Sequence, residues 1–168
     1  MLDYQVVRDG DAGSPAVKLT GWPVNVERLQ TDARVLAARR GFLRRHATGD
    51  GLRLKLKGVY LRDSLLWLTL DVQERTAMGC GPGTLRLYTE DRRKVKRTAT
   101  QELDILPVYA QQIGAVAGFS HQATAIGMRP LVVGRGKRLV IAFTDTQVDR
   151  QIVLKVKGKV LMKARRVN

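Results

Sequence analysis

The segment LRLKLKGVYLRDSLLWLTLDV, residues 52–72, decides the fold class. From residue 52 to residue 57 leucine alternates with arginine or lysine, and from residue 66 apolar residues alternate with Trp67, Thr69 and Asp71. A period of two is the pattern of a β-strand with one buried face, and the run from Arg62 to Ser64 has the composition of a turn. The segment therefore predicts an antiparallel hairpin with one face in the core. The predicted core residues are Leu54, Leu56, Leu66, Leu68 and Leu70.

Shorter runs of the same kind follow this hairpin at regular spacing. They are bounded by Gly, Pro or Asp and are rich in Val, Ile, Leu or Thr. The predicted strands are 84–90, 94–100, 123–128, 138–143 and 151–157. About seven short strands at such spacing predict a mainly β chain with an antiparallel, immunoglobulin-like β-sandwich over residues 49–168.

Upstream of the hairpin the apolar period becomes helical. Asn25 stands where an N-cap is expected, and apolar residues recur at helical spacing until Gly41 offers a C-terminal stop. Residues 25–48 are therefore predicted as one α-helix and a linker. An isolated helix of this length is marginal in water, so we expect it to pack on the sandwich. The expected contacts are Leu29, Ala33 and Leu36. Residues 1–24 combine turn signals with two apolar runs, which predicts an N-terminal extension with one or two short strands.

The composition places the chain among folded proteins with a strong positive charge. It has 168 residues, 44% of them hydrophobic, so it has room for one ordinary domain with an extra arm. Thirty Lys and Arg against fifteen Asp and Glu give a formal net charge of +15. No stretch reaches the roughly 18 to 20 apolar residues of a membrane-spanning helix, and the first residues lack the pattern of a signal peptide. We therefore expect no transmembrane segment.

Motifs that carry chemistry are scarce. Cys80 is the only cysteine, and the two histidines are seventy-five positions apart with no metal-ligand spacing around either. The glycine-rich run 79–83 matches no phosphate-loop pattern and predicts a turn. Glu102 and Asp104 share one face of an extended segment, where ion pairs with nearby arginine are the expected role. The sequence therefore predicts a protein that is not an enzyme, with no catalytic, cofactor-binding or metal-binding residues.

Positive charge is the remaining signal. Five basic residues fall between Arg92 and Arg97, and lysine or arginine also alternates along the first strand, 53–57, and the last, 155–159. If these two strands are neighbours, their solvent faces form one basic patch. The patch could contact nucleic acid, acidic lipid or an acidic protein, or it could be a solvated face whose edge lysines prevent aggregation. Only 5% of residues are aromatic, and they do not interleave with the basic clusters, which favours a solvated face or a protein partner over nucleic acid.

Three blocks carry a resemblance to a known family. They are residues 52–73, residues 91–102 (DRRKVKRTATQE) and residues 106–109 (LPVY), and later segments at 118–120 and 137–141 agree with them. Over about residues 26–162 the chain resembles the C-terminal part of the conjugative-transposon TraN family of Bacteroidetes. It departs from the family at residues 144–150, where the family usually has an acidic hairpin that contains Gly-Gly-Arg. No clear family pattern covers residues 111–116.

The resemblance implies a structural and interaction component of a conjugative DNA-transfer apparatus. By analogy with the β-sandwich component of type IV secretion core complexes, it implies a place in the cell envelope, in the periplasm beside the outer membrane. Implied partners are a lipoprotein, a channel subunit and other copies of the chain. The alternative is a basic β-domain that binds nucleic acid directly. The most family-like and most charged segment supplies the candidate partner-binding residues, which are Arg92, Arg93, Lys96, Arg97, Thr98, Gln101 and Tyr109.

Overall fold

The computed structural model describes residues 4–6, 17–19, 25–93 and 99–168. Near the N-terminus, β1 (Tyr4–Val6) pairs antiparallel with β2 (Val17–Leu19). This agrees with the two short strands predicted for residues 1–24. The later strands form two larger sheets.

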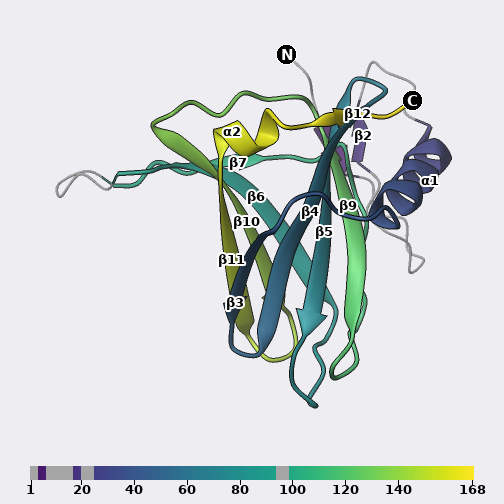
Figure 1. Cartoon of the computed structure of the whole chain (residues 1–168), viewed down its shortest axis with the longest axis vertical. Coiled ribbons are helices and arrows are strands. Elements are labelled where there is room, and N and C mark those ends of the chain that lie inside the picture. The colour runs from purple at the N-terminus through teal and green to yellow at the C-terminus, as the bar shows by residue number, and fades with distance from the viewer. Residues whose placement is uncertain (1–3, 7–16, 20–24, 94–98) are drawn as a thin grey trace.

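The body of the protein is an antiparallel β-sandwich preceded by one helix, which confirms the predicted fold class (Figure 1). One sheet has the order β11-β10-β6-β7, and the other has the order β12-β4-β5-β9-β8 with β3 also paired to β4. The longer strands are β4 (Leu52–Arg62), β5 (Leu65–Glu74), β6 (Gly83–Asp91), β9 (His121–Met128), β10 (Lys137–Asp145) and β11 (Arg150–Lys157). The shorter strands are β3 (Arg45–Gly49), β7 (Leu103–Ile105), β8 (Tyr109–Ala110) and β12 (Arg165–Arg166). The helices are α1 (Val26–Ala37) and α2 (Gly158–Leu161).

The hairpin predicted from residues 52–72 is present as β4 and β5, and its leucines lie between the sheets. All five predicted core leucines are buried there. An irregularity in the pairing between Leu56 and Gly58 shifts the register of β4. Before it the even-numbered residues face this core, and after it Val59 does. A bulge at Lys57 therefore keeps the apolar side of β4 inward along a strand of eleven residues.

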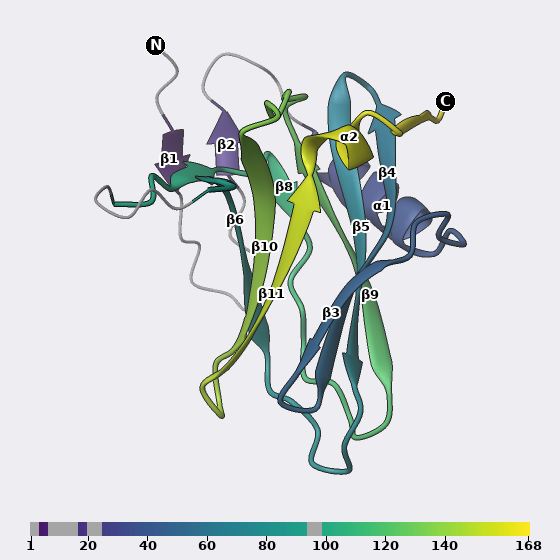
Figure 2. The same cartoon turned by 60° about the vertical axis from the view of Figure 1, so that its left-hand side comes forward.

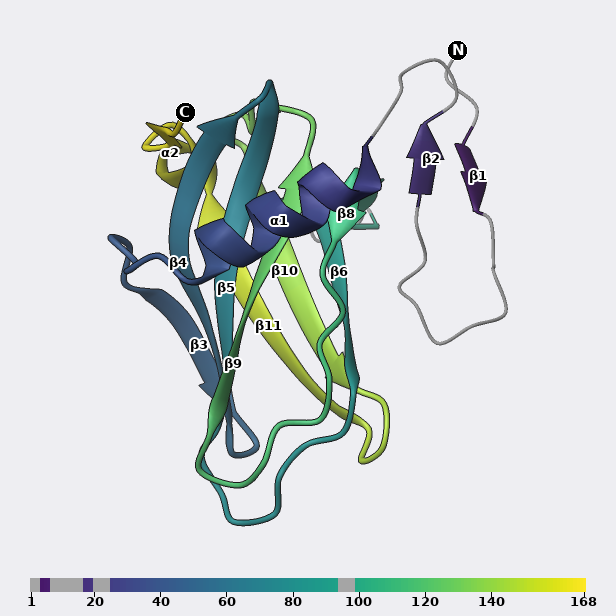
Figure 3. The same cartoon turned by 90° about the vertical axis from the view of Figure 1, so that its right-hand side faces the viewer.

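The second face of the hairpin is also buried, which corrects the expectation of one buried face. Figure 3 shows α1 lying across the outer face of the six-stranded sheet. Beneath it, Trp67 of β5, Tyr60 of β4 and Ala125 of β9 form a second apolar cluster. The three expected contact residues of the helix, Leu29, Ala33 and Leu36, all belong to that cluster. The period-2 pattern did not reveal this layer because Trp67, Thr69 and Asp71 include two polar residues.

Helix α1 begins where predicted and ends earlier. The Asn25 side chain accepts a hydrogen bond from the backbone N–H of Arg28 at 3.2 Å, which is an N-cap. The last helical residue is Ala37, and its carbonyl oxygen accepts a hydrogen bond from Lys57 Nζ at 2.6 Å. A lysine from β4 therefore supplies a positive charge at the helix C-terminus.

The remaining differences concern short elements. Residues 45–48, predicted as part of a linker, form most of β3. The strand predicted at 94–100 falls mainly on residues outside the described part, and the strand that follows β6 in its sheet is β7 at 103–105. In the described part the body has ten strands rather than about seven, because β3, β7, β8 and β12 have no clear apolar alternation.

Candidate partner-binding arm

The basic segment forms part of an arm that extends from the four-stranded sheet. We define the arm as the end of β6, residues 92–102 and β7, of which residues 94–98 are not described. Figure 1 shows its described parts reaching away from the sandwich at the left. Arg92, Arg93 and Gln101 lie on the arm and are exposed. Lys96, Arg97 and Thr98 belong to the same loop by sequence and lie outside the described residues.

The base of the arm is attached to the loop that joins β9 to β10. The backbone N–H of Arg92 donates to the carbonyl oxygen of Gly136 at 2.8 Å, and Arg92 Nη1 donates to the carbonyl oxygen of Arg135 at 3.1 Å. Arg135 is itself exposed, so this loop adds a positive charge beside Arg92 and Arg93. Arg93 and Arg135 are forty-two positions apart in the sequence. They come close only because β6 pairs with β10, where Asp91 is opposite Lys137, so the sequence alone did not indicate their proximity.

The two carboxylates of the arm are both bound by one arginine. Arg86 Nη2 lies 3.1 Å from Glu102 Oε2 and 2.7 Å from Asp104 Oδ1, so the ion pairs expected from their spacing are present. The guanidinium also lies over the ring of Tyr88, 4.2 Å from its centre. The hydrogen bond to Asp104 raises the pKa of Arg86 above its ordinary value, although the side chain is about half exposed. These contacts orient β7 on β6. Because Arg86 neutralises Glu102 and Asp104, the net charge of the arm comes from the cations beyond Asp91.

Tyr109 does not belong to the arm. It lies on β8 in the other sheet, half-buried, with its ring centre 6.2 Å from that of Trp67. Burial raises the pKa of its phenol. The structure thus places Arg92, Arg93 and Gln101 together and Tyr109 apart from them, because the chain crosses from one sheet to the other between β7 and β8.

An apolar cleft lies at the base of the arm. It has a volume of about 240 Å³ and is lined by residues 104–108 and 129–131. Next to it, Leu106 is 62% exposed and Val132 is 84% exposed, and Leu103 of β7 is half exposed. The cleft combines an apolar floor with Arg129 at its wall and the basic arm at its rim. An apolar centre with a polar rim is the usual anatomy of a protein-binding surface.

A family model described as "Domain of unknown function (DUF4138)" matches residues 30–166. The chain belongs to this family. The matched range of DUF4138 begins inside α1 and ends in β12, so it includes both sheets, the arm and the cleft. No curated protein matches the chain.

Among solved structures, the chain is similar to a domain of the outer membrane lipoprotein Omp28 from Porphyromonas gingivalis. The two share 10% sequence identity with a TM-score of 0.38, over 77% of this chain and 99% of that domain.

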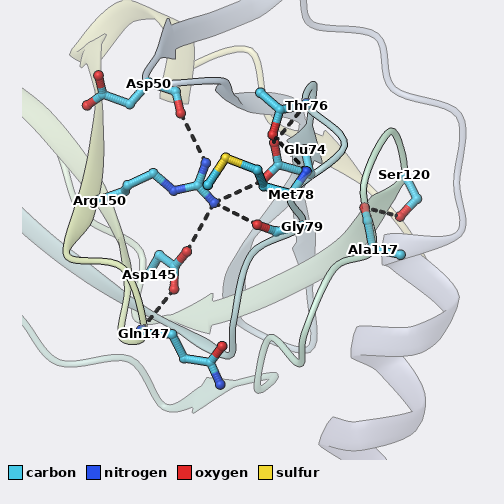
Figure 4. A network of polar contacts seen from close by, with 10 residues as sticks. All are labelled: Asp50, Glu74, Thr76, Met78, Gly79, Ala117, Ser120, Asp145, Gln147 and Arg150. Carbon is cyan, nitrogen blue, oxygen red and sulfur yellow. Dashed lines mark hydrogen bonds and ion pairs between the residues drawn. The ribbon is translucent and has the colours of Figure 1, made fainter.

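A buried polar network holds together the end of the DUF4138 sandwich away from the cleft (Figure 4). Arg150 Nη2 lies 2.9 Å from Glu74 Oε2 and 3.2 Å from Asp145 Oδ2, and it donates to the carbonyl oxygen of Gly79 at 3.0 Å. Arg150 Nη1 donates to the carbonyl oxygen of Asp50 at 3.1 Å. One guanidinium therefore joins the ends of β5 and β10, the start of β11 and the turn before β4.

Both carboxylates of this network are stabilised as anions. Burial would raise the pKa of Glu74, but hydrogen bonds from Thr76 and Arg150 outweigh it, so its pKa lies below its ordinary value. The pKa of Asp145 is lowered in the same way, by the backbone N–H of Gln147 and by Arg150 against the effect of burial. Every carboxylate oxygen of Glu74 and Asp145 accepts a hydrogen bond from the protein, so the network stabilises the fold at this end of the sandwich.

Outside the network, the described part of the chain has one cysteine and one contact between a histidine and a carboxylate. No group of three or more His, Cys, Asp or Glu side chains is arranged to hold a metal ion among those residues. Cys80 is buried, and burial raises the pKa of its thiol. His121 Nδ1 lies 2.9 Å from Asp71 Oδ1. Neither helix of the described residues has the length and apolarity that a membrane span requires.

Proposed function

We propose that this chain is a non-enzymatic structural and interaction component of a conjugative DNA-transfer apparatus in the cell envelope. The observation that carries the proposal is the basic arm beside the apolar cleft. TraN-like residues 91–102 supply most of the arm, and residues 106–108 line part of the cleft. The implied partners are a lipoprotein and a channel subunit, with further copies of the chain in the assembled complex.

The arrangement of the arm supports a protein partner rather than a solvated face. Exposed Leu103, Leu106 and Val132 lie together at the arm's base, where a solvated face needs no apolar side chains. The clustered cations of the arm repel one another in the free protein, and an acidic partner surface relieves that repulsion. The proposed interface therefore has an apolar contact in the cleft and charge pairs at its rim.

The experiment combines a charge reversal on the arm with an apolar disruption in the cleft. The double substitution Arg93→Glu with Arg97→Glu replaces two positive charges of the arm by negative ones. The substitution Leu106→Asp places a carboxylate at the cleft. We expect both variants to keep the melting temperature of the wild type, because Arg93 and Leu106 are exposed. We expect both to lose co-assembly with envelope components and to lower the frequency of DNA transfer between cells.

A matched control has the same change in net charge at another place. Arg34→Glu with Arg75→Glu reverses two exposed arginines, one on α1 and one directly after β5, both outside the arm and the cleft. Assembly by this control and loss of assembly by the arm variant locate the partner at the arm. Normal transfer by both the arm variant and Leu106→Asp would overturn the proposal.

A further inference from the structure

One side of the molecule is rich in basic residues, although exposed Asp50, Asp63 and Asp149 lie in its turns. It consists of segments 33–49, 51–62 and 150–168, which hold sixteen of the thirty Lys and Arg and no Asp or Glu. The segments are adjacent in space, since β3 and β12 both pair with β4 and β11 packs against β3 and β4. Figure 2 shows β11, β3, β4 and α2 on the side turned toward the viewer. We call this surface the basic side.

Six exposed arginines follow one edge of β4 within the basic side. They come from the connection between α1 and β3 and from the C-terminal strand, and we call them the arginine edge: Arg39, Arg40, Arg44, Arg45, Arg165 and Arg166. The edge of β4 that is not paired with β5 holds β3 along its first half and β12 along its second. Between them, the backbone N–H groups of Phe42 and Leu43 donate to the carbonyl oxygen of Lys57, at 2.8 and 2.9 Å. The bulge in β4 thus fixes the connection that carries three of these arginines and leads into Arg45, the first residue of β3.

Aromatic rings order two arginines of this edge. The Arg165 guanidinium lies over the Phe42 ring at 3.9 Å, and that of Arg39 lies 5.8 Å from the centre of Tyr60. The two rings contact each other edge to face, with centres 5.6 Å apart. A guanidinium held by its flat face keeps its N–H edge available for a bidentate anion. Among the described residues, none of the six arginines has a carboxylate partner.

The chemical composition of this surface indicates which class of ligand it binds. Of the large hydrophobic residues in the three segments, only Val35 and Met162 are exposed, so the surface lacks the apolar centre of a protein interface and the apolar insertion that strengthens binding to lipid. Binding to phosphate groups requires neither an apolar centre nor an apolar insertion. Guanidinium groups bind them bidentately, which suits an edge made of arginine without lysine.

The spacing agrees with a nucleic-acid strand. Arg45 is opposite Leu56 and Arg166 is opposite Leu61, so the edge spans five strand residues, or about 17 Å. A nucleic-acid strand places more than one phosphate within this length. We propose that the arginine edge binds the phosphodiester backbone of nucleic acid. It does so without regard to base sequence, because Phe42 and Tyr60 are occupied by arginines and each other. This site is separate from the arm and does not depend on the function proposed for it.

The test measures binding of the full chain to labelled DNA by fluorescence anisotropy. The probes are random-sequence single strands and duplexes of about 30 nucleotides, in salt from about 50 to about 200 mM. Arg40→Glu with Arg44→Glu should lower the affinity about tenfold or more and reduce the slope of log K against log salt by about 2. Arg93→Glu with Arg97→Glu changes the net charge equally and should change the affinity less than about threefold, because those residues lie outside the edge.

Two further probes separate nucleic acid from other anions. Polyglutamate presents negative charge without phosphate, and vesicles containing anionic phospholipid present phosphodiester groups that are not joined in a strand. The proposal expects both to bind more weakly than DNA at equal salt. Equal loss of DNA binding in the two double variants would overturn the proposal, since binding would then follow net charge alone. Equal or tighter binding to vesicles or polyglutamate would also overturn it. The melting temperature of each variant verifies folding, and Arg40→Gln with Arg44→Gln supplies a milder pair if the reversal does not fold.

Discussion

Trp67 and Leu68 are consecutive residues of β5 and both are fully buried, on opposite faces of the same sheet. Leu68 lies in the core between the two sheets, while Trp67 lies in the cluster under α1. β5 is therefore the central strand of a three-layer arrangement, with the four-stranded sheet on one side and a helix on the other.

The first prediction follows from this pair. Leu68→Ala should lower the free energy of unfolding by about 2 to 5 kcal/mol, and Trp67→Ala should lower it by about 3 to 5 kcal/mol, because each leaves a cavity in a different layer. Equilibrium denaturation in urea measures both. A loss below about 1 kcal/mol for either residue would mean that its face of β5 is not closely packed.

The second prediction concerns the attachment of α1. Leu36 is fully buried against the sheet, so Leu36→Asp places a charge in an apolar layer and should destabilise the whole domain by more than about 3 kcal/mol. Val35, the next residue, is 47% exposed, and Val35→Asp should change stability by less than about 1 kcal/mol. Thermal melting compares the two. An unchanged melting temperature for Leu36→Asp would show that the helix is independent of the sandwich.

The third prediction concerns the Arg150 network. Arg150→Met leaves Glu74 and Asp145 buried without their cation and should cost about 3 to 5 kcal/mol of stability. The control is Arg28→Met, which removes an exposed ion pair with Asp63 and should cost no more than about 1 kcal/mol. Chemical denaturation of both variants gives the comparison. Similar losses would show that the network contributes no more than a surface pair.

The fourth prediction is the pH dependence of the same network. The folded pKa values of Glu74 and Asp145 lie below their ordinary values, so their stabilisation is fully present above the ordinary carboxyl range and is lost as pH falls through the folded values. The free energy of unfolding should therefore decline below about pH 4. Urea denaturation at a series of pH values measures this decline.

A matched pair of variants assigns the acid dependence to the network. Glu74→Gln should make the decline shallower, because one titrating group is removed from it. Glu27→Gln, at an exposed position in the first turn of α1, should leave the decline unchanged. The same decline in wild type and Glu74→Gln would assign the acid sensitivity to other carboxylates.

The fold could be predicted wherever one strand face is apolar and the other polar. Residues 52–72 met that condition, and so did the apolar period of α1, which predicted its contact residues Leu29, Ala33 and Leu36. β3 could not be predicted, because at the edge of its sheet only Ala47 packs against the core. The end of α1 was also missed, since the cation at its C-terminus is Lys57, twenty residues further along the chain.

The candidate site could be predicted only in part, for a related reason. The charge of Arg92 and Arg93 is visible in the sequence, and the structure places both on an exposed arm. The apolar base of the arm is not visible, because Leu106 and Arg129 meet only when the crossing from β7 to β8 is folded beside the end of β9. The arginine edge was missed for the same reason, since a C-terminal strand completes it on β4.

The way the chain alternates between the sheets has a consequence during synthesis. β4 and β5 are made early, but β10 and β11, which complete the opposite sheet, come some 60 to 100 residues later. Helix α1 precedes the hairpin and can cover its Trp67 face early, while the leucine face waits for the opposite sheet. A nascent chain with so apolar a surface is prone to aggregation. Efficient production of this protein should therefore depend on a chaperone, or on slow release, until residue 157 has left the ribosome.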